Sequence, residues 1–79
     1  MRDTAYFTTM GRFVHACVRL EVLLETAPAT LPAGVRAAQA ELAALLVRMV
    51  DGSLQPTEEE LDALTARAEA AIRDGQAAG

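Results

Sequence analysis

The stretch from Thr4 to Thr26 constrains this chain most, because its apolar residues recur with the period of an α-helix. One set follows at steps of three and four residues and therefore shares one side of the predicted helix. This seam consists of Tyr6, Met10, Phe13, Cys17, Leu20 and Leu24. Further apolar side chains fall beside it, namely Phe7, Val14, Val18 and Val22 on one flank and Ala16 and Leu23 on the other. Together they cover roughly 260° of the helix circumference, more than twice the arc of a surface helix, so this helix must be buried on more than one side.

The same periodicity predicts an all-α chain of three helices. Their expected ranges are about 4–26, 32–50 and 58–74. The apolar stripe of the second helix consists of Val35, Ala38, Leu42, Leu45 and Met49. A thinner stripe in the third helix consists of Leu61, Leu64, Ala68, Ala71 and Ile72. Each helix therefore has an apolar side to contribute to a shared core.

The helix ends carry recognisable local signals. Gly52 is expected to end the second helix in the left-handed conformation that glycine adopts without strain. Thr57 and Glu60 have the spacing of a capping box, in which each residue satisfies a free N–H group of the other. Gly75 is expected to stop the third helix, and residues 75–79 are expected to form a flexible tail.

These elements predict a single domain over residues 1–79, folded as a three-helix antiparallel bundle, since short turns favour antiparallel neighbours. The long apolar first helix would pack against an α-hairpin of the second and third helices, whose alanines allow close approach. A chain this short buries only about 60–65% of its unfolded surface. We therefore expect oligomerisation to complete the bundle, through a homodimer, a higher homo-oligomer or a heterologous protein.

Composition narrows the classes of partner and compartment. The net charge of −4 argues against nucleic acid, because phosphate backbones are bound by clustered lysine and arginine. No stretch reaches the roughly 18 apolar residues of a membrane-spanning helix. The single cysteine, Cys17, indicates a reducing compartment, so we expect a cytoplasmic protein. The chain has neither lysine nor asparagine, a usage typical of a GC-rich bacterial genome.

Arg12, His15 and Arg19 line up at i, i+3 and i+7 and form a concentrated basic patch in an acidic chain. This polar stripe has two interpretations. It is either a docking stripe for an acidic partner, including the glutamate-rich third helix of another copy, or the solvated face that any helix needs.

The residue patterns predict no catalytic, cofactor-binding or metal site. His15 and Cys17 point about 160° apart on a helix and cannot hold the same ion. Glu21 and Glu25 lie at the apolar arc, where a buried carboxylate is costly unless an arginine pairs with it. Two such groups suit acid–base chemistry, but neither a nucleophile nor an orienting histidine accompanies them. We therefore expect no enzymatic activity and no cofactor.

The function predicted best is a non-enzymatic protein–protein interaction or self-assembly module that associates through its first helix. The expected interface consists of Tyr6, Phe7, Met10, Phe13, Val14, Cys17, Leu20 and Leu24. One alternative is a small acidic inhibitor, antitoxin or phage-type antagonist that blocks another protein's surface. A second alternative is an accessory subunit with a pocket at the bundle interface.

Overall fold

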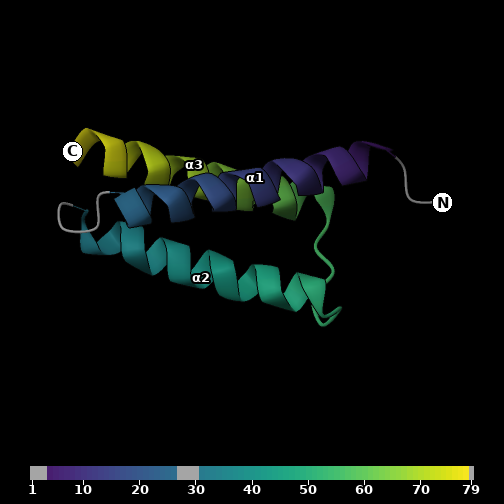
Figure 1. The fold of residues 1–79 in the computed structure, drawn as a ribbon. Helices are drawn as coiled ribbons and strands as arrows, with labels where there is room; N and C mark the ends of the chain where they lie inside the picture. The colour runs from purple at the N-terminus through teal and green to yellow at the C-terminus, as the bar shows by residue number, and fades with distance from the viewer. Residues whose placement is uncertain (1–3, 27–30, 79) are drawn as a thin grey trace.

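The computed structural model describes residues 4–26 and 31–78, which form three helices (Figure 1). Helix α1 spans Thr4–Thr26, α2 spans Ala33–Val50 and α3 spans Glu58–Ala78. The described residues contain no β-strand, so the all-α prediction is confirmed. α2 runs opposite to its two neighbours, whereas α1 and α3 run in the same direction (Figure 1).

Local backbone chemistry sets the ends of α2 and the start of α3. Pro32 is the N-cap of α2 and has an extended ψ of 149°, so the helix begins just after its predicted start. Gly52 has a φ of +85° and ends α2 as expected. The Thr57 N–H donates to Glu60 Oε1 at 2.9 Å, and the Glu60 N–H donates to Thr57 Oγ1 at 3.1 Å. The predicted capping box is therefore confirmed.

The core lies between the three helices and contains the apolar stripes predicted from the sequence. Its largest fully buried side chains are Phe13, Leu20, Leu42 and Leu61. The other buried apolar members are Ala16, Val35, Ala68, Ala71 and Ile72. Partly buried side chains pack around them, namely Tyr6, Met10, Cys17, Leu24, Ala38, Leu45, Leu46, Met49 and Leu64. The α1 seam is therefore part of the core of the single chain.

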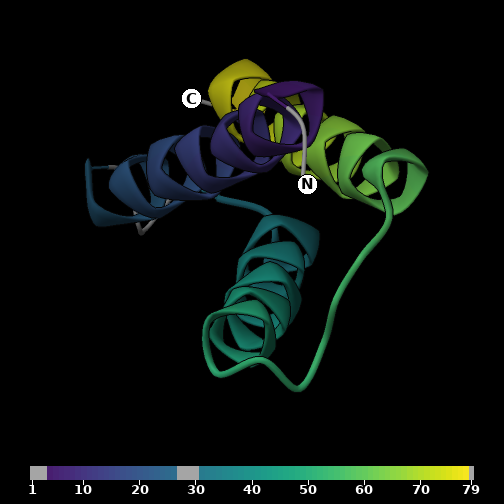
Figure 2. The same cartoon turned by 90° about the vertical axis from the view of Figure 1, so that its right-hand side faces the viewer.

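α1 packs more extensively against α3 than either helix packs against α2. Figure 2 shows this arrangement end-on, with α1 and α3 together and α2 to one side. The expected hairpin of α2 and α3 is therefore not the main packing unit. The reason is side-chain size: α1 buries Phe13 and Leu20, whereas the buried residues of α2 are Val35 and Leu42. Gly75 of α3 also leaves room for Leu23 of α1 to approach closely.

α3 continues through Gly75 to Ala78. Gly75 is buried, and a Cβ atom built on it would lie 2.6 Å from Leu23 Cδ2 and 2.9 Å from Leu31 Cδ2. Its φ is not positive, so it is not a left-handed cap. This glycine lies inside the helix, where the methyl groups of Leu23 and Leu31 would have to move to admit a side chain. The predicted helix end before Gly75 and the predicted tail over residues 75–79 are therefore wrong over the part that the structure describes.

Candidate functional site

α1 keeps a second apolar surface that its own bundle leaves open to solvent. Phe7 is 62% exposed, Val18 is 51% exposed and Val22 is 49% exposed. Val14 lies between them and is partly buried. Together with Gly11 they follow one face of the helix at steps of three and four residues. We call Phe7, Gly11, Val14, Val18 and Val22 the outer stripe.

The residues that were predicted to form an interface lie partly in the core and partly on the surface. Phe13 and Leu20 are fully buried within the bundle. Four others are partly buried and pack against the same core: Tyr6, Met10, Cys17 and Leu24. Phe7 and Val14 remain, and both belong to the outer stripe. An interface that leaves the bundle folded must therefore use the outer stripe more than the seam.

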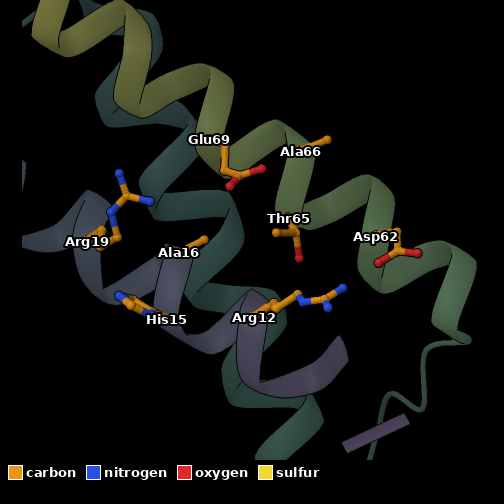
Figure 3. A pocket seen from close by; sticks show the side chains of 8 residues that line it. All are labelled: Arg12, His15, Ala16, Arg19, Asp62, Thr65, Ala66 and Glu69. Atoms are coloured by element: carbon orange, nitrogen blue, oxygen red, sulfur yellow. The ribbon is translucent and has the colours of Figure 1, made fainter. Parts of the chain in front are cut away.

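A groove with a volume of about 310 Å³ runs between α1 and α3 (Figure 3). Its α1 wall is lined by Arg12, His15, Ala16 and Arg19, and its α3 wall by Asp62, Thr65, Ala66 and Glu69. The charged side chains on both walls are exposed. The predicted polar docking stripe is therefore one wall of a groove that also has an acidic wall. Sequence reasoning missed the second wall, although its residues repeat the i, i+3, i+7 spacing of the first.

The two walls are in register, because each α1 residue of the groove has its counterpart 50 positions later in α3. Figure 3 shows Arg12 at the Asp62 end of the groove and Arg19 at the Glu69 end. On each wall the two charges are separated by two helical turns, about 10.5 Å. No ion pair within 4 Å joins these two walls, both of which lie in the described part of the chain. The groove therefore presents a column of cations beside a column of anions.

The groove becomes apolar towards the C-terminal ends of α1 and α3. There it continues as a hollow of about 340 Å³, lined by His15, Val18, Arg19, Val22, Leu23, Thr26, Ile72 and Gln76. Val18 and Val22 also belong to the outer stripe, so the groove and the stripe form one continuous surface. This surface has a charged half and an apolar half, and such a surface is suited to binding another protein.

Glu21 and Glu25 are both exposed, so neither is a carboxylate trapped in the core. Glu21 borders a crevice of about 40 Å³ between α1 and α2, together with Cys17 and Gln39. Burial raises the pKa of the Cys17 thiol. A thiol with a raised pKa is protonated at neutral pH and is a poor nucleophile. The crevice therefore offers no activated group for covalent chemistry.

An ion pair between α2 and α3 lies outside the groove. Arg67 Nη2 donates to Glu41 Oε2 at 2.6 Å, and Arg67 Nη1 donates to Glu41 Oε1. The hydrogen bond from Arg67 holds the pKa of the Glu41 carboxyl below its usual range, and Glu41 raises the pKa of the Arg67 guanidinium. Both side chains are about half exposed, so water screens the pair. It is a contact between two helices and does not form a pocket with convergent polar groups.

Residues 4–26 and 31–78 contain no group of three or more histidine, cysteine, aspartate or glutamate side chains arranged to hold a metal ion. Within the same ranges, no helix is both long and apolar enough to cross a membrane. Comparison with known proteins adds no relative, because no protein-family model, curated protein or solved structure matches the chain. The class that the structure defines is a small all-α protein of three packed helices.

Proposed function

We propose that this chain is a non-enzymatic helical interaction module that self-associates through α1. The outer stripe carries this proposal, since Phe7, Val18 and Val22 stay about half exposed or more while the opposite side of α1 fills the core. The stripe extends over about four helical turns and adjoins a groove. A contiguous apolar surface bordered by polar residues is typical of a protein–protein contact.

Covering the outer stripe supplies the driving force for association. Removal of apolar area from water contributes about 25 cal/mol per Å², so covering a half-exposed valine contributes about 1–2 kcal/mol. Val18 and Val22 are expected to contribute most, because they lie in the outer stripe and also line the hollow that continues the groove. A Cβ atom built on Gly11 would meet no atom within 4 Å, so the stripe has a shallow place where another helix can approach closely.

The substitution Val18→Asp tests this proposal by placing a charge in the middle of the outer stripe. Val47→Asp is the matched control, because Val47 is 63% exposed on α2 and lies outside the stripe. We expect the wild-type chain and V47D to sediment as dimers, and V18D to sediment as a monomer with unchanged helix content. If V18D associates as tightly as the wild type, the outer stripe is not the interface and the proposal fails.

Antagonism of a basic partner is a second candidate function, favoured by the charge of α3. The carboxylates of α3 are Glu58, Glu59, Glu60, Asp62, Glu69 and Asp74. The basic residues of α3 are Arg67 and Arg73, so the net charge of α3 is −4, equal to that of the whole chain. An acidic helix suits the surface of a basic, nucleic-acid-binding protein, because complementary charge accelerates encounter.

The oligomeric state of the purified chain distinguishes the two candidate functions. A stable homo-oligomer supports self-association. A monomer that forms a complex of fixed stoichiometry with one basic protein supports antagonism. In that complex, E58Q/E59Q should lower the association rate at low salt, because both carboxylates are exposed on the acidic helix.

A further inference from the structure

We propose that a second copy of the chain docks on the groove between α1 and α3, about a two-fold axis that runs along the groove. The inference rests on the proposed self-association and adds the surface on which the second copy docks and its orientation. Two features of the groove support it, namely the register of its two charged walls and its apolar half.

The charged half of the groove is complementary to itself. A two-fold axis along the groove keeps each residue at the same height along the helices and exchanges the two walls. The α1 wall of one copy therefore faces the α3 wall of the other. Arg12 then faces Asp62 of the second copy, and Arg19 faces Glu69 of the second copy. Because the two walls are in register, both contacts form together without a shift along the helices.

A two-fold axis across the groove gives the opposite result. It reverses the second copy, so that α1 faces α1 and α3 faces α3. Arg12 then meets Arg19 of the second copy, and Asp62 meets Glu69 of the second copy. Like charges brought together across an interface are costly and act against that arrangement. The charge pattern therefore selects the axis along the groove.

The apolar half of the groove selects the same axis. With the axis along the groove, the apolar halves of the two copies cover each other, and the exposed Val18 and Val22 of each copy lie at the edge of this contact. With the axis across the groove, the apolar half of each copy would cover the charged half of the other. Charged groups would then lose water without gaining partners, which is unfavourable.

The two halves have different roles in this dimer. Exposed ion pairs contribute little affinity each, because water and salt screen them. The apolar half, with Val18 and Val22, therefore drives association, and the charged half determines orientation. The four charged positions of each copy should accordingly matter most at low ionic strength.

Charge reversal on one wall at a time tests the inference. R12E/R19E makes both walls negative, and D62R/E69R makes both walls positive. Each pair is expected to raise the dimer Kd at least about tenfold at low ionic strength, measured by sedimentation equilibrium. The quadruple variant, which carries both pairs, restores one positive and one negative wall and should dimerise like the wild type. R36E/R48E is the control for R12E/R19E, because it lowers the net charge by the same amount on α2, away from the groove.

Mixing the two reversed variants provides a test that does not depend on loss of binding. An equimolar mixture of R12E/R19E and D62R/E69R should form a mixed dimer, with a Kd at least about tenfold below that of either variant alone. Formation of this mixed dimer also shows that both variants are folded. Its failure to form overturns the inference.

Disulfide cross-linking in the Cys17→Ser background tests the orientation. Thr8, Thr26 and Gln76 are exposed, and each receives the one cysteine of its chain. Chains with Thr26→Cys should cross-link to chains with Gln76→Cys, because the axis along the groove places these ends together. Cross-linking between Thr8→Cys and Thr26→Cys chains instead would overturn the proposed orientation, because that contact needs a reversed second copy.

The outcomes separate this inference from the proposed function on which it rests. A wild-type chain that remains monomeric overturns both. A wild-type dimer that V18D disrupts, but that the charge reversals leave unchanged, supports self-association through α1 and overturns docking along the groove. Loss of the dimer in both reversed variants, with its recovery in the quadruple variant, supports both.

Discussion

The Tyr6 hydroxyl donates a hydrogen bond to the carbonyl oxygen of Pro56 at 3.2 Å. Pro56 is buried and Tyr6 is partly buried, so this bond lies at the edge of the core. It joins the first turn of α1 to the segment that leads into α3. The same offset of 50 residues recurs in the groove, where Arg12 lies level with Asp62. This contact therefore shares the register of the charged walls and lies about two helical turns before Arg12 and Asp62.

Tyr6→Phe removes this hydrogen bond and keeps the ring. A hydrogen bond of this kind contributes about 0.5–1.5 kcal/mol, so the free energy of unfolding should fall by about 1 kcal/mol in urea denaturation followed by circular dichroism. Thr8→Val is the control, because the exposed Thr8 hydroxyl donates only to the Thr4 carbonyl oxygen of the same helix, at 2.9 Å. Its effect should stay within about 0.5 kcal/mol. Equal stability of Y6F and the wild type would show that the bond does not hold the two helices.

Gly75 and Gly34 should respond in opposite ways to a larger side chain. A Cβ atom on Gly34 would meet no atom within 4 Å, so Gly34→Ala should stabilise the fold by about 0.4–1 kcal/mol. Gly75→Val should destabilise it by about 1–3 kcal/mol, because Leu23 and Leu31 must move. Thermal unfolding of both variants measures the difference. A G75V chain as stable as the wild type would contradict the close packing of α3 at this position.

Thr57→Ala should lower the free energy of unfolding by about 1 kcal/mol, because α3 loses the hydroxyl that accepts from the Glu60 N–H. Glu60→Gln is the matched comparison. Glutamine retains an oxygen that can accept from the Thr57 N–H, so E60Q should lose less stability than T57A. Chemical denaturation of the two variants measures the order, and the reverse order would contradict the capping box.

The Glu41 carboxyl should titrate below the usual pH of a glutamate in the folded chain, because Arg67 donates to its ionised form. A pKa depressed by folding adds stability above the unfolded pKa, and this stability is lost as the pH falls below about 4. Arg67→Gln should return the Glu41 pKa towards its usual value, measured by NMR titration of the carboxyl carbon. An unchanged Glu41 pKa in R67Q would show that the ion pair does not form in solution.

Much of the fold follows from local sequence. The spacing of Phe13 and Leu20 identifies the core side of α1, and Leu42 and Leu61 identify the core sides of their helices. These positions are fully buried because they lie at the centre of stripes with helical period. Gly52 and the capping box were also predictable, since each depends on residues within a few positions of one another.

The errors come from effects that act between distant segments. Gly75 has the sequence appearance of a helix stop, but Leu23 and Leu31 fill the space in which its side chain would lie. The acidic wall of the groove was missed for a similar reason. Asp62 and Glu69 repeat the spacing of the basic residues on α1, yet only the parallel packing of α1 and α3 brings the two sets to the same level. Helical period predicts the side of a helix on which a residue lies, but not which residue of another helix it will face.

The measurement that tests the central claim most directly is the absolute molar mass of the wild-type chain, by light scattering on a sizing column across a dilution series. Self-association through α1 predicts a species of twice the 8.4 kDa chain mass at high concentration, which dissociates on dilution. A folded species of 8.4 kDa at every concentration would contradict the account, because the outer stripe would then be stable without a second copy.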